Sequence, residues 1–449
     1  MEKIDRREMI LTDNLWKVMI KLSVPAIVAM LLYGLNTIFD AIFVGQFVGE
    51  DALSGVSLAY PLTQLSIGIG SMIGGGAGAY LSIAIGEENK DIQRKILGNA
   101  NFLIVVLSII MMIVALIFAR PLIYIMGGRG EILTLGTEYF RITLFGTIFW
   151  VAGLTYNLII RAEGKMGTAA AIMAVGLVVN IIANYIFMGI LNYGVAGAAW
   201  GTNIGMILYT ILSGFYFRSG KPSFEANLKS FRRDKNIIKK IVSMGMPSLI
   251  MTIMMIIQGA VILSTISSVG TDYDIAFYGV VYRINTFMMT PLFATMRSLQ
   301  PTVGINFGAK KYSRVVSATK VYILGSLILL LPFWLILMID PTLILGLMFK
   351  NAVSTLNIMY YRIFIMIIPF MSITMMGLSF FPSINRGNIG SMIAMLRQVL
   401  LYIPVMLILP RLFGIGYVYI GSFLIDITVT LLTGVLLIKE FSKLKKIKN

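Results

Sequence analysis

Long apolar stretches alternate with short polar breaks along almost the whole chain. Their lengths match the roughly 20 apolar residues that an α-helix needs to cross a bilayer. A basic segment at 218–240 divides the pattern into two groups of six. The pattern predicts an all-α polytopic membrane protein with twelve transmembrane helices, approximately over 17–44, 53–85, 96–119, 132–158, 167–190, 195–217, 241–268, 275–307, 321–339, 357–381, 391–409 and 416–438.

The composition fits a chain whose surface is as apolar as its core. Hydrophobic residues make up 58% of the 449 residues and charged residues 13%, whereas an ordinary soluble domain has about 45–50% and about 25%. A typical cytosolic enzyme and a disordered chain are therefore excluded. The chain also has no Cys and no His, which excludes disulfides, thiol chemistry, His-ligated metals and His-based catalysis. We expect neither an enzyme nor a bound cofactor.

The formal net charge of +17 is distributed unevenly between the predicted loops. If both termini are cytoplasmic, 28 of the 37 basic residues fall on the cytoplasmic side and four in the outer loops. Positive loop residues are retained inside, so this bias predicts the orientation. We expect a multi-pass protein of the inner or plasma membrane with both termini in the cytoplasm. The charge then reports topology and contact with membrane lipids, and does not indicate a nucleic-acid partner.

The two halves of the chain echo each other at an offset of 220 to 223 residues. Five pairs recur in the same order: Pro25 with Pro247, Gly86 with Gly308, Arg141 with Arg362, Gly164 with Gly387, and Gly194 with Gly414. Each half holds an even number of spans, so both enter the membrane from the same side as parallel repeats. The sequence thus predicts an N-terminal lobe (1–217), a cytoplasmic linker (218–240) and a C-terminal lobe (241–449). Two such lobes are typical of transporters, and a duplicated scaffold without transport is the alternative.

Asp40 is a carboxylate inside the first predicted span, where an acid is costly and usually functional. It lies 19 residues after Lys21, or about 28 Å of helical rise, in the outer half of the membrane. Other polar side chains fall at a similar depth in the first lobe: Tyr139, Asn180, Asn184 and Thr202. Their oxygens suit H⁺ or Na⁺, with a Na⁺ ion expected at Asp40, Asn180 and Thr202. The alternative is that these groups only hold helices together.

The second half lacks an acid equivalent to Asp40, because residue 262 is Ile. Asp426 is placed at a depth compatible with Arg397, and we interpret the two as a structural ion pair. Glu138 is expected to pair locally with Arg141. Three arginines within spans have no acid that the sequence can assign to them: Arg283, Arg297 and Arg362.

Pro25 lacks a backbone N–H early in the first span and can kink that helix. A kink below Asp40 would act as a hinge that lets the helix bend when the carboxylate changes state. The alternative, a static kink, is equally compatible with the sequence.

Several segments resemble the multidrug and toxic compound extrusion (MATE) family, and its DinF-like and MepA-like bacterial members in particular. The resemblance covers essentially the whole chain and is most specific between Asp40 and Leu62. The segments that carry it are LSVPAI at 22–27, IFDAIFVGQFVGEDALSGVSLAYPL at 38–62, IGEENKDIQRKILGNA at 85–100, GVAGAAWGT at 194–202 and FGAKKYSRV at 307–315.

The resemblance implies twelve helices in two lobes and export of cationic or amphipathic drugs in exchange for H⁺ or Na⁺. It also implies that Asp40 is the ion-binding carboxylate, with Tyr139, Asn180 and Thr202 as its partners. Asn184 is a departure, because some members carry a second Asp there. We expect small-molecule drugs and membrane lipids as partners and a monomeric protein. The alternative function is a lipid or lipid-linked oligosaccharide flippase of the same superfamily.

Overall fold

The computed structural model describes residues 6–228, 230–349 and 353–447. The first half of the chain forms one bundle of helices, and this bundle contains Asp40 and the other residues of the predicted ion site. Its helices are α1 (Arg6–Thr12), α2 (Leu15–Phe47), α3 (Glu50–Gly86), α4 (Lys90–Ile125), α5 (Gly130–Phe145), α6 (Thr147–Ala162), α7 (Met166–Asn184), the π-helix η1 (Tyr185–Ile190) and α8 (Gly194–Arg218).

The second half forms a second bundle, and the described residues of both contain helices and turns without a β-strand. Its helices are α9 (Lys235–Val269), α10 (Asp272–Gly308), α11 (Tyr312–Ile339), α12 (Thr342–Met348), α13 (Thr355–Ile365), the 3₁₀ turn η2 (Ile368–Phe370), α14 (Met371–Ser383), α15 (Gly387–Met395), the π-helix η3 (Leu396–Leu401), α16 (Tyr402–Phe413) and α17 (Tyr417–Lys446). The predicted all-α architecture of two repeated lobes is confirmed.

Ten helical segments among the described residues are long and apolar enough to cross a membrane, and the bent pair α5 and α6 makes an eleventh. The remaining predicted span is α10, a helix of 37 residues. It is more polar than the others because it carries Arg283 and Arg297. It packs against α2, α3, α11 and α14, so protein rather than lipid surrounds much of it.

Two of the predicted spans are broken, and the breaks occupy equivalent places in the two repeats. α5 and α6 meet at Gly146 with a bend of 54°, and a Cβ atom at this glycine would collide with the Asn203 side chain. In the second lobe the corresponding span is interrupted by η2, which contains Pro369. Glycine at a close approach and proline within a helix are common causes of kinks.

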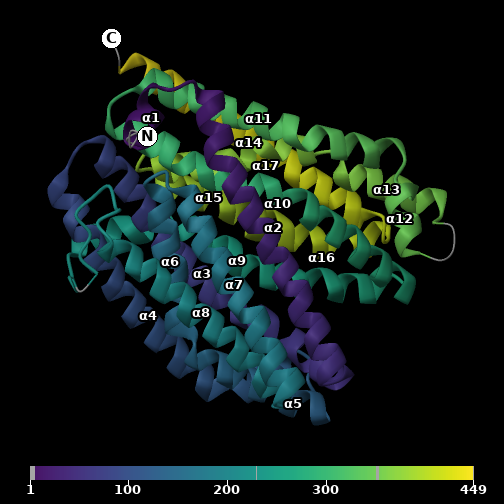
Figure 1. Ribbon diagram of the computed structural model, residues 1–449. Helices are drawn as coiled ribbons and strands as arrows, with labels where there is room; N and C mark the ends of the chain where they lie inside the picture. Colours follow the sequence, from purple (N-terminus) through teal and green to yellow (C-terminus); the bar gives the residue numbers. More distant parts are fainter. Residues whose placement is uncertain (1–5, 229, 350–352, 448–449) are drawn as a thin grey trace.

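The two lobes are packed together at the end of the molecule that carries both chain termini, here called the terminal end (Figure 1). Contacts across the lobe boundary join α3 to α9 and α10, and α2 to α10. Gly86 and Gly308 meet there so closely that a Cβ on either would strike the backbone of the other segment. Toward the opposite end the bundles diverge, with α5 and α12 far apart in Figure 1.

The short helix α1 bridges both lobes at the terminal end. Arg7 Nε donates to the Ile85 carbonyl at 3.1 Å and its guanidinium pairs with Glu88 at 2.6 Å, both in the first lobe. From the second lobe, Arg314 Nε donates to the Ile10 carbonyl at 3.1 Å. The apolar side chains of α1 (Met9, Ile10 and Leu11) are buried.

The segment between α8 and α9 is held against the first lobe. Asn101 Nδ2 donates to the carbonyls of Leu228 and Ser230 at 2.8 and 2.9 Å. Glu163, just after α6, accepts a hydrogen bond from the Ser223 backbone N–H. Burial raises the pKa of the Glu163 carboxyl, although the nearby Lys165 ammonium opposes this shift.

Candidate functional site

Asp40 lies in α2, fifteen residues beyond Pro25, and receives hydrogen bonds from two amides. Asn184 Nδ2 donates to Asp40 Oδ1 at 2.7 Å, and Asn36 Nδ2 donates to Asp40 Oδ2 at 3.2 Å. The first bond joins α2 to the end of α7, and the second spans one turn of α2. An ionised carboxylate is an acceptor only, so both of its oxygens are matched with N–H donors in this arrangement.

Two glycines of α8 leave room for the side-chain amides of Asn180 and Asn184 on α7. Gly201 lies directly against the Asn184 side chain, and Gly205 lies against the Cβ of Asn180. A Cβ atom at either glycine would collide with the asparagine. The four-residue spacing of these glycines puts them on one face of α8, where two helices can approach closely. Asn184 is also the last residue of α7 before the π-helix η1, a type of irregularity that is frequent at functional sites.

The other predicted residues surround this pair. Tyr139 of α5 lies beside Thr202 of α8 and near Asp40, while the Thr202 hydroxyl donates to the Ala198 carbonyl at 3.0 Å. Asn180 is 1% exposed, and neither its amide oxygen nor its amide nitrogen has a partner among the described residues. Of the predicted side chains, Asn184 bonds directly to Asp40 and Tyr139 lies near it with Thr202, whereas Asn180 lies one turn before Asn184 on α7, against Gly205 of α8.

Three amide oxygens in this cluster are buried and lack a hydrogen-bond donor among the described residues. They belong to Asn36, Asn180 and Asn184. Buried acceptors are normally satisfied, so the oxygens of Asn36 and Asn184, the two residues that bond to Asp40, are acceptors available to a cation or an ordered water. The described residues contain no cluster of three or more acidic, His or Cys side chains suited to a multivalent metal. One carboxylate with neutral oxygens suits H⁺ or a monovalent cation.

Asn36, which bonds to Asp40, was missed in the sequence analysis, as were Tyr33 and Tyr60, which lie near this carboxylate. The signal for Asn36 was available, because it precedes Asp40 by four residues and therefore shares its helical face. The direct bond from Asn184 was less accessible, since it depends on the distance between α2 and α7. The predicted local pair of Glu138 with Arg141 is wrong. The two form no ion pair among the described residues, and both side chains are exposed.

In the second lobe, Arg397 Nε donates to Asp426 Oδ1 at 2.7 Å. The pair joins η3 to α17 and is mostly buried, with side chains 20% and 14% exposed. Gln398, the next residue, accepts a hydrogen bond from Gln258 of α9. Arg397 and Gln398 lie within the π-helix η3, and in the first lobe Asn184 directly precedes the π-helix η1.

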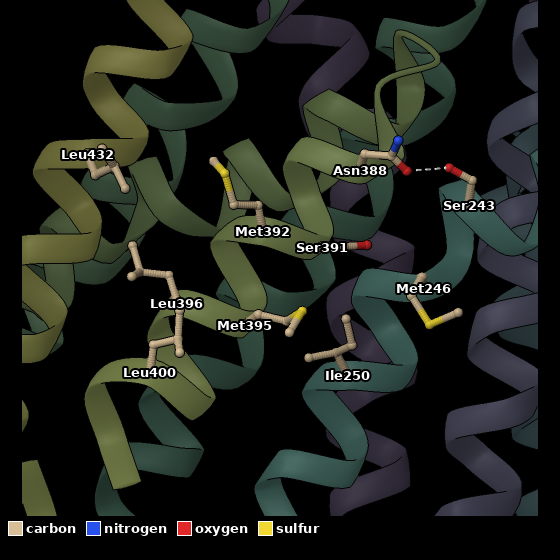
Figure 2. Close-up of a pocket in the computed structure, with 10 residues that line it drawn as sticks. All are labelled: Ser243, Met246, Ile250, Asn388, Ser391, Met392, Met395, Leu396, Leu400 and Leu432. Atoms are coloured by element: carbon tan, nitrogen blue, oxygen red, sulfur yellow. Dashed lines mark hydrogen bonds between the residues drawn. The ribbon is translucent and has the colours of Figure 1, made fainter. Parts of the chain in front are cut away.

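A pocket of about 730 Å³ lies in the second lobe, between α9, α15, η3 and α17 (Figure 2). Figure 2 shows apolar side chains on its walls, including Met246, Met392 and Met395, and a polar rim where Ser243 Oγ donates to Asn388 Oδ1 at 2.8 Å. The volume is in the range of small-molecule sites. This pocket is in the opposite lobe from Asp40, so the pocket and the ion site are separate.

The chain forms two lobes related by a parallel repeat, and one lobe holds a carboxylate that accepts hydrogen bonds from side-chain amides. These features define a membrane transporter of the two-lobe class. The sequence model of the MatE family matches this chain twice, over residues 25–186 and 247–408. The chain belongs to the MatE family, in its MepA-like branch. The offset between the two matches is 222 residues, in agreement with the repeat found in the sequence.

Curated relatives match along nearly the whole chain. The multidrug export protein MepA of Staphylococcus aureus (strain MRSA252) is 26% identical over 432 residues, which cover 94% of this chain and 93% of that protein. The protein of the same name from Staphylococcus haemolyticus is 25% identical over 422 residues, covering 93% and 92%.

Solved structures share the fold. One is described as the outward-facing conformation of a multidrug resistance MATE family transporter, with a TM-score of 0.89, 22% identity and coverage of 99% of this chain and 100% of that chain. Another, MATE in the bent conformation, has a TM-score of 0.91 and 21% identity, and covers 99% of both chains.

Proposed function

We propose that this chain is a secondary-active multidrug exporter that moves cationic or amphipathic compounds out of the cell in exchange for H⁺ or Na⁺. The observation that carries the proposal is the Asp40 carboxylate, which accepts hydrogen bonds from Asn184 at 2.7 Å and from Asn36 at 3.2 Å, two residues whose buried amide oxygens have no donor among the described residues. The names of the Staphylococcus relatives, which are multidrug export proteins, support the substrate class. They lend no support to the flippase alternative.

Ion binding at Asp40 changes how α2 is held to α7. A proton on the carboxyl turns one of its oxygens into an O–H donor and a weaker acceptor, so the hydrogen bond from the amide N–H at that oxygen weakens. A Na⁺ ion would instead draw in oxygen ligands, which the amides of Asn180 and Asn184 can provide by rotating. In both cases occupancy alters the bond between the outer half of α2 and the rest of the first lobe.

Pro25 is the proposed hinge for this change. Because proline has no N–H, α2 lacks one backbone hydrogen bond at this position and bends there more readily. α2 is continuous from Leu15 to Phe47 in this structure, with Pro25 inside it. Solved structures of a MATE protein include both bent and straight conformations and a P26A mutant, and an equivalent transition is proposed here.

The proposed orientation places the terminal end in the cytoplasm of a bacterial cell, in agreement with the excess of basic residues there. With the lobes packed at that end, this structure corresponds to the state that is open to the outside. Drug binding and ion binding would then alternate with rocking of the lobes. We further propose that the protein acts as a monomer in the plasma membrane, without an enzymatic step, a bound cofactor or a nucleic-acid partner.

Export by proteoliposomes with imposed H⁺ or Na⁺ gradients tests the proposal. Asp40→Asn should abolish gradient-driven export of a panel of cationic dyes, while the thermal stability of the purified protein stays near that of the wild type. Glu138→Gln is the matched control, because it removes an exposed carboxylate from the same lobe and should leave export intact. Near-normal export by Asp40→Asn would overturn the proposal. Comparing the two gradients identifies the coupling ion.

A further inference from the structure

A second, smaller cavity of about 70 Å³ lies at the boundary between the lobes. Its walls come from α3, α6, α9, α10 and α14, so both lobes contribute. Five polar side chains line it: Ser71, Ser248, Arg297, Gln300 and Ser379. Arg297 precedes the end of α10 by eleven residues, or about 16 Å of helical rise, which places the cavity well inside the membrane.

Arg297 has no counter-charge in this cavity. Among the ion pairs and side-chain hydrogen bonds of the described residues, none involves Arg297, and its Nε atom is buried without a partner. A second guanidinium, that of Arg161 in α6, is near enough for the two charges to repel. Among the described residues, the hydrogen-bond partners of Arg161 are neutral: Nε donates to Asn157 Oδ1 at 2.8 Å, and Nη2 donates to Met173 Sδ at 3.7 Å.

Such an arrangement is unfavourable unless something negative offsets it. A charged side chain within the membrane usually pairs with an opposite charge or lines a water-filled cavity. Arg297 lines the cavity, Arg161 is near enough to repel it, and no carboxylate is among the lining residues. An anion held in the cavity would offset this positive charge.

We propose that this cavity binds a small inorganic anion, such as chloride, against the Arg297 guanidinium. Guanidinium offers five N–H donors, and the lining adds three serine hydroxyls. Gln300 uses one N–H to donate to the Gly75 carbonyl at 3.1 Å, which leaves the second N–H of its amide for the anion. Every one of these groups can donate a hydrogen bond to an anion.

The cavity is large enough for a small ion but not for a drug-sized ligand. A volume of 70 Å³ accommodates a halide with about one water molecule, given that a water occupies about 30 Å³ in the liquid. Drug-sized ligands need about 300–1,000 Å³. The cavity is therefore too small for the exported compound.

The site exists only while the lobes are packed together at the terminal end. Ser71 belongs to α3 of the first lobe, whereas Ser248 and Arg297 belong to α9 and α10 of the second. Separation of the lobes would remove Ser71 and the walls from α3 and α6, open the cavity and weaken its hold on the anion. Bound anion thus stabilises the conformation seen here, whether or not Asp40 couples transport to an ion.

The test is thermal unfolding of the detergent-solubilised full chain in sodium chloride or sodium bromide against sodium gluconate, at constant Na⁺ and constant ionic strength. The apparent Tm of the wild type should rise with halide concentration and saturate, because a ligand that binds only the folded state stabilises it. Arg297→Gln should remove this rise. Arg283→Gln is the matched control, because it removes an exposed guanidinium from the same helix and should leave the halide effect unchanged.

Anomalous diffraction from crystals grown in bromide provides a second measurement that does not depend on folding of the variants. We expect a bromide peak beside Arg297. The proposal is overturned if the wild type shows no saturable halide effect, if Arg297→Gln retains it, or if bromide occupies only other positions. Stabilisation by inorganic phosphate without any effect of halides would also overturn it.

Discussion

The Ser23 and Ser298 hydroxyls lie 2.7 Å apart across the lobe boundary, and both side chains are buried. The Ser298 hydroxyl also donates to the Thr295 carbonyl at 2.9 Å, so Ser23 is the donor in the bond between the lobes. The repeat offset of 222 makes Gly245 the equivalent of Ser23 in the second lobe, and Gly76 the equivalent of Ser298 in the first. Gly76 and Gly245 also meet across the boundary. The interface between the lobes is therefore built around the axis that relates the repeats.

Removing the acceptor of this bond should weaken the packing of the lobes at the terminal end. Ser298→Ala leaves the Ser23 hydroxyl buried without its partner, at a cost of about 1 kcal/mol, or roughly a fivefold change in the population of the closed interface. Distance measurements between spin labels on the two lobes would detect the shift. Ser383→Ala is a control, because the Ser383 hydroxyl bonds within its own helix, to the Ser379 carbonyl. Equal distance distributions for wild type and Ser298→Ala would contradict the prediction.

Asn184→Asp should change the ion dependence of export. The new carboxylate would stand beside Asp40, where Asn184 now donates a hydrogen bond. Two adjacent carboxylates cannot both ionise easily, and together they attract a cation more strongly than one does. We expect the pH at which export changes to become higher, or the increase of export with Na⁺ to become larger. The measurement is transport over a pH series with and without Na⁺, and an unchanged profile would show that residue 184 does not act on Asp40 during transport.

Arg397 and Asp426 should behave as a coupled pair in stability. Either Asp426→Asn or Arg397→Gln alone leaves a mostly buried charge without its partner, which costs about 3 kcal/mol, whereas the double variant removes both charges and should recover part of the loss. A double-mutant cycle on purified protein measures the coupling. Ion dependence of export should stay the same in all three variants, because the pair is in the second lobe. Additive losses of stability would argue against pairing, and loss of ion coupling in well-folded Asp426→Asn would move the ion site to the second lobe.

The buried Glu163 should give the protein a pH-dependent stability. Because burial raises its pKa in the folded state, the folded protein holds this proton more tightly than the unfolded chain does. Stability conferred by the protonated carboxyl is present at low pH and decreases as pH rises from about 4 through the raised pKa. Glu163→Gln cannot titrate, so its apparent Tm relative to the wild type should increase over this range.

Glu225 provides the control for this experiment. It is exposed, and its hydrogen bond from Arg94 lowers the pKa of its carboxyl. Its contribution to stability therefore has the opposite sign, being lost as pH falls, and it should be small because solvent screens the pair. If Glu163→Gln and Glu225→Gln show the same pH dependence relative to the wild type, the assignment to Glu163 is wrong.

Much of the architecture could be predicted because it depends on local properties of the sequence. The apolar stretches have the length that a helix needs to cross the membrane, so they predict the spans. The constant offset between pairs such as Pro25 and Pro247 predicts the repeat. Asp40 could be singled out because an acid within an apolar stretch is conspicuous, and helical rise gives its depth. Asn180 and Asn184 could be placed on one face of their helix by spacing alone.

Other features depend on distances between helices, which spacing along one helix does not contain. The bend at Gly146 follows from the approach of Asn203, and the bond from Asn184 to Asp40 requires the packing of α7 on the glycines of α8. The sequence showed that Arg297 lacked an assignable acid, but only the tertiary structure placed it in a cavity shared by the lobes. Local patterns set where the polar groups lie along each helix, and the packing of helices from distant parts of the chain decides which of them meet.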